Sequence, residues 1–225
     1  MRYVMSCLVV FLLILIVVMA QPTTTSPTPP NQKPSPTDQA GDPKAAAEQG
    51  LQALRALVDE QNYRDLGFES QNEAASATLG EPLRVVLVRL DQLREFQPES
   101  DPSRLLTRTT EMIYPVLAGG QARCSITLTQ EGGKWTAAAF GGAKLIRQIT
   151  KVRNALVPSA NIFVKVPALN VYFIARQEEG AAAGLMLTPL TDQPEYRMKE
   201  GVALPAKDAF SALVPAAKAH DGKTS

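Results

Sequence analysis

Residues 111–142 read EMIYPVLAGGQARCSITLTQEGGKWTAAAFGG, and this stretch decides the fold class. Three runs suited to β-strands are separated by two glycine pairs, Gly119-Gly120 and Gly132-Gly133. Because glycine readily adopts the positive φ angles of tight hairpin turns, the pattern predicts an antiparallel meander. Pro115 has no N–H to donate to a ladder, so we expect its strand at a sheet edge or at a bulge.

Similar runs flank the meander on both sides. The run LRVVLVRL at 83–90 precedes it, and NIFVKV, LNVYFIAR and LMLTPL follow Pro158, all typical of strands. A helix is predicted at 143–156, and a last helix begins near Pro205, with Pro215 expected to kink or end it. The apolar positions that define these two helices are Leu145, Ile149, Val152, Leu156, Phe210, Leu213, Val214 and Ala217.

The order of these elements gives two strand-strand-strand-helix runs, at 83–157 and 161–219. Runs of strands outnumber single strand-helix alternations, which favours the α+β class with an antiparallel sheet. The two runs are either a duplicated β-β-β-α unit or parts of one continuous antiparallel sheet with helices on one side. We therefore predict a globular domain over 44–219, undivided or made of subdomains 44–157 and 161–219, and a tail at 220–225.

An amphipathic helix is predicted ahead of the strands. Asp42-Pro43 is typical of an N-cap followed by proline at the first helical position. The helix extends to about Gln61, and Gly50 within it costs about 1 kcal/mol relative to alanine, so its first half is expected to fray. The residues that share its apolar face are Leu51, Leu54, Leu57 and Val58.

Residues 1–20 carry Arg2 ahead of an almost unbroken apolar run that ends at the small residue Ala20. This arrangement is typical of a signal peptide cleaved after Ala20. The run is also close to the ~20 residues of a membrane-spanning helix, so an uncleaved anchor over residues 4–20 is the alternative. Both interpretations place the rest of the chain outside the cytoplasm: periplasmic, at the cell surface or secreted.

Residues 21–43 hold seven prolines and five threonines and no apolar side chain larger than Ala40. Such a segment cannot bury enough surface to offset the entropy lost on ordering, so it is predicted to be disordered. Proline keeps it extended, which is typical of a linker between a membrane and a domain.

The charges are balanced. The chain has 23 basic and 22 acidic residues, and Arg2 is the only charged residue of 1–20, so 22 of each follow. Nucleic-acid binding normally needs a clear basic excess on one face, and we therefore expect no nucleic-acid partner.

Cys124 is the one cysteine after residue 20, so no internal disulfide is expected there. Residues alternate between the faces of a strand, so Cys124 shares its face with Ile126 and Leu128. A catalytic thiolate needs a cationic, partly exposed setting and usually a histidine base. Because the single histidine is His220, in a tail expected to be mobile, we interpret Cys124 as core packing.

Other catalytic patterns are missing from the sequence. One histidine and one cysteine cannot make the usual zinc ligand sets, so no metal and no cofactor is expected. The chain contains no G-x-S-x-G elbow, no G-x-x-x-x-G-K-[ST] loop and no G-x-G-x-x-G loop. Hydrolysis by a pair of carboxylates from distant segments stays open as an alternative.

Two features are candidate binding sites. Lys144, Arg147 and Lys151 recur at helical spacing on the face opposite the apolar stripe of the predicted helix 143–156, just after Gly141-Gly142. Backbone N–H groups and cations at a helix start can hold an anion, although a solvated helix face gives the same spacing. The second feature is Trp135 beside the Gly132-Gly133 turn, which is either ordinary core or a contact for a ligand or partner.

The stretches 66–98 (LGFESQNEAASATLGEPLRVVLVRLDQLREFQP) and 112–142 (MIYPVLAGGQARCSITLTQEGGKWTAAAFGG) resemble uncharacterised exported bacterial proteins. In those proteins a leucine-glycine-glutamate-proline segment precedes a strand, and a tyrosine-proline-valine strand precedes a hairpin with tryptophan. The resemblance spans residues 60–190, and it implies an exported α+β protein with no particular activity. The order of helix and meander is also similar to cystatin-like and inhibitory pro-domain folds, which is fold-level analogy alone.

These observations favour a non-catalytic protein of the cell envelope, tethered near the membrane by its N-terminal segment. Its sheet is expected to bind an envelope protein or a small ligand. The alternatives are an exported hydrolase that uses Asp and Glu residues as acid and base, or an inhibitor-like or chaperone-like module.

Overall fold

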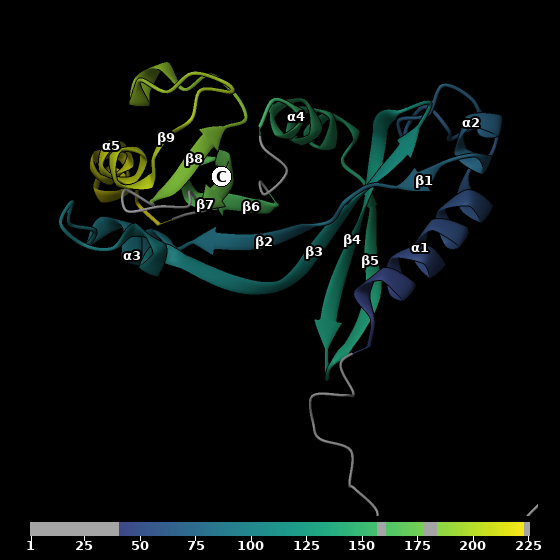
Figure 1. The fold of residues 1–225 in the computed structure, drawn as a ribbon, viewed down its shortest axis with the longest axis horizontal. Coiled ribbons are helices and arrows are strands. Elements are labelled where there is room, and N and C mark those ends of the chain that lie inside the picture. Colours follow the sequence, from purple (N-terminus) through teal and green to yellow (C-terminus); the bar gives the residue numbers. More distant parts are fainter. Residues whose placement is uncertain (1–40, 157–160, 178–183, 223–225) are drawn as a thin grey trace, which may run out of the picture. The chain divides into compact units, whose positions relative to one another are not determined.

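A computed structural model describes residues 41–156, 161–177 and 184–222. The chain divides into two units, Met1–Pro36 and Thr37–Ser225. The predicted signal or anchor and nearly all of the linker lie outside the described residues, and the fold below is that of the second unit (Figure 1). Among its described residues, no helix has the length and apolar character needed to cross a membrane.

The described part of this unit is an α+β fold with one nine-stranded, mostly antiparallel sheet, which confirms the predicted class. The strands are β1 (Thr78–Leu79), β2 (Leu83–Val88), β3 (Leu106–Ala118), β4 (Gln121–Glu131), β5 (Lys134–Gly141), β6 (Ile162–Val166), β7 (Val171–Gln177), β8 (Leu185–Pro189) and β9 (Leu204–Pro205). The helices are α1 (Pro43–Leu57), α2 (Gln71–Ala75), α3 (Leu90–Arg94), α4 (Ala143–Asn154) and α5 (Ala206–Ala219). Short 3-10 turns are η2 (Pro102–Leu105), η3 (Pro167–Leu169) and η4 (Pro194–Tyr196).

The sheet consists of two meanders that meet at their first strands. The order across the sheet is β5-β4-β3-β2-β6-β7-β8-β9, and β2 pairs with β6 in parallel. Each meander is followed by a helix, α4 after the first and α5 after the second. The two halves of the sheet thus share an order of four strands followed by a helix, one strand more than predicted, and the two helices belong to clusters on opposite faces.

Three clusters of buried side chains form the core. Helices α3 and α5 cover Val86 and Val164, and α1 covers Tyr114 and Val116 on the same face of the sheet, which we call the α1/α5 face. Helix α4 packs on the other face, the α4 face, over strands of both meanders. The expectation of helices on one side only is therefore wrong, because side chains alternate along β2 and each face presents its own apolar row. On the α4 face these buried residues include Leu83, Val85, Ile113, Phe163 and Ile174.

Strand β3 begins at Leu106, five residues earlier than predicted, and lies inside the sheet, between β4 on one side and β2 and β1 on the other. Pro115 lies where the neighbour of β3 on this side changes from β2 to β1. β2 is paired with β3 as far as Ile113, β1 pairs from Val116, and the carbonyl of Pro115 accepts from Gly80 N–H at 2.7 Å. The missing N–H therefore falls at a break between two neighbours, so an interior strand tolerates proline here.

Helix α1 is continuous through Gly50, contrary to the expected fraying. Asp42 caps it as predicted, with its carboxylate accepting from Lys44 N–H at 2.9 Å. Gly50 is buried, and a Cβ at this position would lie 3.1 Å from Cγ2 of Ile126 and 3.2 Å from Cβ of Ala137. Glycine is present because the helix approaches β4 and β5 closely.

Helix α5 continues past Pro215 to Ala219, so the proline does not end it. Pro215 is exposed, and water can therefore replace the hydrogen bond that proline removes.

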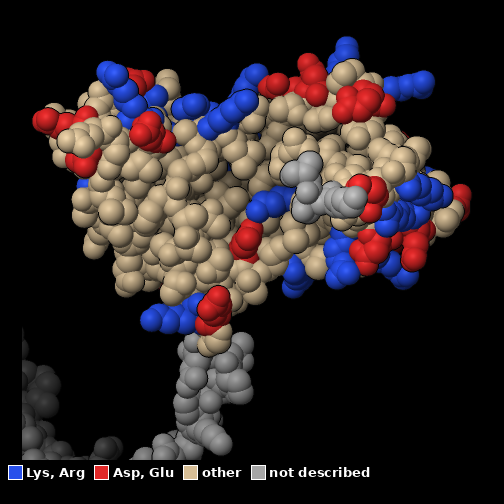
Figure 2. Space-filling view, turned by 180° about the vertical axis from the view of Figure 1, so that it is seen from behind, with Lys and Arg blue, Asp and Glu red and all other residues tan. Residues whose placement is uncertain are grey.

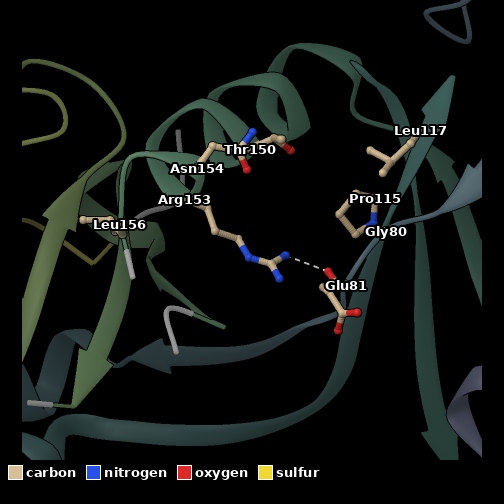
Figure 3. A pocket seen from close by; sticks show the side chains of 8 residues that line it. All are labelled: Gly80, Glu81, Pro115, Leu117, Thr150, Arg153, Asn154 and Leu156. Carbon is tan, nitrogen blue, oxygen red and sulfur yellow. Dashed lines mark hydrogen bonds between the residues drawn. The ribbon is translucent and has the colours of Figure 1, made fainter. Parts of the chain in front are cut away.

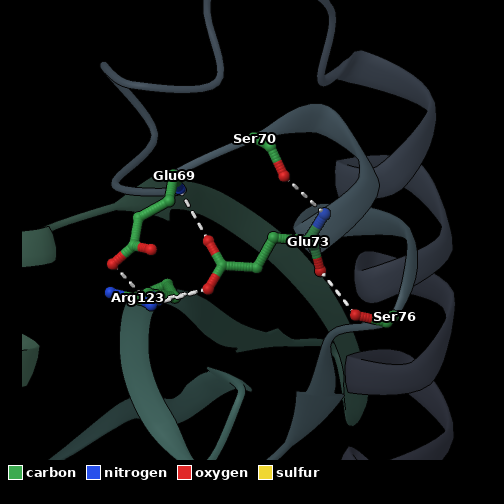
Figure 4. Close-up of polar contacts among 5 residues, drawn as sticks. All are labelled: Glu69, Ser70, Glu73, Ser76 and Arg123. Atoms are coloured by element: carbon green, nitrogen blue, oxygen red, sulfur yellow. Dashed lines mark hydrogen bonds and ion pairs between the residues drawn. The ribbon is translucent and has the colours of Figure 1, made fainter.

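The segment between α1 and β1 is fastened to β4 by a cluster of polar groups (Figure 4). Arg123 lies at a register shift between β3 and β4 and pairs with Glu73 at 2.7 Å and Glu69 at 2.8 Å. Ser70 caps α2 by accepting from Glu73 N–H, and the Glu73 carboxylate accepts from Glu69 N–H. A bulge that redirects a side chain explains why Arg123 points to this segment.

Candidate functional site

Cys124 is fully buried among apolar side chains beneath α1. Desolvation raises the pKa of its thiol to about 12, so the thiolate is scarce at neutral pH. His220 caps the end of α5, where its N–H donates to Ala216 and its carbonyl accepts from Arg94. It is therefore held at a helix end, contrary to the expected mobile tail, and that helix packs in a different buried cluster from Cys124. The thiol and the imidazole form no catalytic pair.

The predicted cations of α4 are all exposed and lie at two different hollows. Lys144 lines one beside Tyr172, whereas Arg147 and Lys151 line another beside the β3–β4 turn. The Lys151 ammonium pairs with Glu200 at 2.6 Å, and this hydrogen bond raises its pKa. The three side chains are therefore not gathered around one position.

A pocket of about 380 Å³ lies between the end of α4 and the β1–β2 connection (Figure 3). Arg153 points across it, and its guanidinium donates to the main-chain oxygen of Glu81 at 2.7 Å. Burial lowers the Arg153 pKa from its ordinary value. Arg153 therefore already connects α4 to the sheet, and its guanidinium group is occupied by this structural contact. We do not take the pocket as the main candidate for a ligand site.

The strongest candidate is a cavity of about 480 Å³ on the α1/α5 face. It lies between the buried cluster beneath α1, the α1 core, and the buried cluster beneath α3 and α5, the α5 core. We call this cavity the sheet hollow. Its apolar lining comes from four strands, β2, β3, β5 and β6: Val85, Val86, Leu106, Met112, Trp135 and Ile162. Its polar lining is Arg84, Ser103, Arg108, Thr109, Glu111 and Gln130.

A bulge in β3 forms the middle of the sheet hollow. Arg84 pairs with Met112 and Val86 with Arg108, so three residues of β3 stand opposite Val85 alone. Thr109 holds this geometry, because its Oγ1 donates to Val85 O at 2.8 Å and accepts from Glu111 N–H at 3.1 Å. Bulges are common beside binding sites because they redirect side chains and interrupt the ladder.

The indole of Trp135 is half-buried at the β5 side of the sheet hollow. It packs against the rim of the α1 core while also lining the cavity. The core interpretation therefore fits one part of the side chain, and the other part lines the cavity. Partly exposed aromatic groups beside a concavity are common contacts for ligands and partners.

The carboxylates of the described residues do not converge in these cavities. The sheet hollow has one, Glu111, and the Lys144 hollow has none. Glu95 and Asp101 share a smaller pocket, but Asp101 caps η2, and the hydrogen bonds from Ser103 lower its pKa. Within the same residues no cluster of three or more His, Cys, Asp or Glu groups has the arrangement of a metal site.

Sequence reasoning found Trp135 but missed Arg84 and Arg108. Arg84 is the one charged residue within the strand LRVVLV, and this interruption of an apolar run was an available signal. Arg108 was missed because residues 106–110, LTRTT, were not recognised as strand, although threonine is a good β-former.

Charged side chains of both signs lie around the edges and near the middle of the face seen in Figure 2, while a broad area over the half with α1, β4 and β5 shows none. Comparison of the chain with protein-family models, curated proteins and solved structures gives no match. The function must therefore be argued from the sheet hollow itself.

Proposed function

We propose that this chain is a non-catalytic, exported protein of the cell envelope that binds a protein partner or a small ligand in the sheet hollow. Residues 1–20 direct its export or anchor it, and residues 21–43 separate the membrane from the domain. The single observation that carries the proposal is the sheet hollow, which combines an accessible indole with two exposed arginines over a sheet bulge.

The size and lining of the sheet hollow support binding. A cavity of about 480 Å³ lies within the range of ligand sites, roughly 300–1,000 Å³. Its lining combines six apolar residues with six polar ones, so it offers contacts to both the apolar and the polar part of a ligand. Acid-base hydrolysis would need carboxyl groups that converge on one pocket, and the sheet hollow offers only Glu111.

Site-specific photocrosslinking in the native host tests the proposal. A photoreactive amino acid replaces Gln130, at the sheet hollow, or Lys207, on the exposed side of α5. We expect an adduct in the envelope fraction from position 130 and none from position 207. The same samples locate the chain by fractionation, and N-terminal sequencing shows whether Ala20–Gln21 is cleaved.

A variant that fills the cavity provides the control. Ile162→Trp adds bulk to the floor of the sheet hollow, and Val202→Trp adds the same group at a position that is 56% exposed. The adduct from position 130 should disappear in the first variant and persist in the second. Equal amounts of the position-130 adduct in the two variants would contradict the proposed function. Recovery of the protein in the cytoplasmic fraction would contradict it as well.

A further inference from the structure

The sheet hollow carries two cations without partners. Within the described residues, the guanidinium group of neither Arg84 nor Arg108 has a hydrogen bond or an ion pair, although both residues line the cavity. The one carboxylate of the lining, Glu111, is already paired with Lys165 at 2.8 Å. The local charge that remains is therefore positive, in a chain whose total charge is nearly balanced.

The register places the two arginines as diagonal neighbours on adjacent strands. Arg108 stands opposite Val86, and Arg84 precedes Val86 by two residues on the same face of β2. Diagonal Cα atoms on adjacent strands are roughly 7–8 Å apart, a separation that two long guanidinium side chains can span to reach one group. Guanidinium groups bind carboxylate and phosphate oxygens through paired hydrogen bonds.

The apolar part of the lining favours a ligand with an apolar portion. Leu106, Met112 and Ile162 are half-buried beside the arginines, and Trp135 offers an aromatic face. A fully hydrated anion such as free phosphate would leave these apolar groups without a partner. The cavity volume suits a single ring or a short acyl chain.

We propose that the sheet hollow binds a small amphipathic anion, with an apolar body against Met112 and Trp135 and a carboxylate or phosphate between Arg84 and Arg108. This inference rests on the proposed function and names its ligand class. Charge and shape act together: the oxyanion neutralises the unpaired guanidinium groups while the apolar body displaces water from the floor.

The protein contains its own reporter, because Trp135 is the only tryptophan. The full chain is reconstituted in phosphatidylcholine vesicles, and its fluorescence is followed on titration with four probes of similar size. These probes are 4-phenylbutyrate, phenyl phosphate, uncharged 4-phenylbutanamide and cationic 4-phenylbutylamine. We expect saturable binding of the two anions, about tenfold weaker binding of the amide, and none of the amine. The ratio between the two anions identifies the preferred head group, and inorganic phosphate alone should compete poorly.

Charge-removing variants connect the binding to the arginines. Arg84→Gln and Arg108→Gln should each weaken binding of the preferred anion about tenfold and leave binding of the amide unchanged. Arg89→Gln is the matched control: it removes the same charge just after β2, where Arg89 is 60% exposed and paired with Asp91, and it should change nothing.

Two results would overturn the ligand class. Either the amide binds as tightly as the acids, or neither arginine variant weakens binding of the anions. In both cases the proposed function stands as long as the photocrosslinks at position 130 still depend on an open cavity. The crosslinks could instead persist in Ile162→Trp while the anions bind as expected. The sheet hollow would then be an anion-binding site, and the envelope partner would bind elsewhere on the protein.

Discussion

At the scale of a single residue, Cys124 shows how burial removes chemistry from a reactive group. Its neighbours along β4, Ile126 and Leu128, are fully buried with it, as the alternation in the sequence predicts. The alternation could be read from the sequence because a strand has only two faces, and one of them must be apolar when it lies in a core.

The thiol should therefore be inert in the native protein. In a Cys7→Ser background, a maleimide probe should label Cys124 only as fast as the protein unfolds, and in denaturant within seconds. Rapid labelling of the native chain would show that the sulfur is accessible.

The same burial predicts a dependence of stability on pH. The thiol pKa is about 9 when exposed and about 12 in the fold, so between these values the unfolded state loses a proton that the native state keeps. The free energy of unfolding should therefore fall as pH rises from 9 towards 12, by at most ~1.4 kcal/mol per pH unit. Denaturant melts across this range measure the effect, and Cys124→Ala should remove this part of the slope while tyrosine and lysine titration persists.

At the scale of an element, α1 shows why local propensity fails. Propensity treats Gly50 as a weak point, whereas in the fold its missing side chain allows the helix to approach β4. No signal within the helix sequence reports this contact, since the partners Ile126 and Ala137 lie far along the chain. The helix, its cap and the burial of Leu51, Leu54 and Val58 were predictable because they depend on neighbours within one turn. Two details of that prediction are wrong: Leu57 is 55% exposed, and the helix ends there and not near Gln61.

Gly50→Leu is the corresponding test. Helix propensity alone gives a gain of about 1 kcal/mol, but the added side chain meets Ile126 and Ala137, and overpacking typically costs 1–3 kcal/mol. We expect a net loss of about 1 kcal/mol in denaturant unfolding. Gln49→Leu, at the exposed neighbouring position, should change stability by less than about 0.5 kcal/mol. A stabilised Gly50→Leu protein would show that α1 does not pack as described.

The attachment of α2 depends on one cation. Arg123 and Glu73 are only 12% and 15% exposed, so Arg123→Met leaves a poorly solvated carboxylate without its partner. The expected loss is about 2 kcal/mol, with faster hydrogen exchange confined to residues 63–77. Glu69 is 74% exposed, and Glu69→Gln should cost less than about 0.5 kcal/mol because water screens that pair. Similar losses in both variants would contradict this account of the cluster.

At the scale of the whole molecule, the sheet hollow could not be assembled from sequence. Its lining comes from β2, β3, β4, β5 and β6, and the pairing of β2 with β6 joins residues about 80 positions apart in the sequence. Periodicity identifies strands but not their order across a sheet. Trp135 was identified by its residue type, whereas Arg84 and Arg108 become neighbours only when β2 pairs with β3 across the bulge.

Helix α4 determines whether the two meanders behave as one folding unit. Ile149, 1% exposed, belongs to a cluster with Val85 and Ile113 from the first meander and Phe163 and Ile174 from the second. Ile149→Ala removes contacts to both at once and should cost about 3 kcal/mol. Because both meanders lose contacts with α4, hydrogen exchange should become faster to the same extent in β4 and in β7. The change in both strands should match the decrease in the free energy of global unfolding.

A contrasting variant separates this behaviour from independent subdomains. Leu213→Ala lies in α5, in a cluster that holds strands of the second meander and Val86 and Val88 of β2 but no residue of β4. If the sheet unfolds as a unit, this variant too should accelerate exchange in β4, where Leu213 makes no contact. If instead β4 keeps its protection in Leu213→Ala while β7 loses it, the two meanders unfold separately and β2–β6 pairing does not couple them. The sheet hollow would then be a site between two independent folding units, and its affinity would depend on how often they separate.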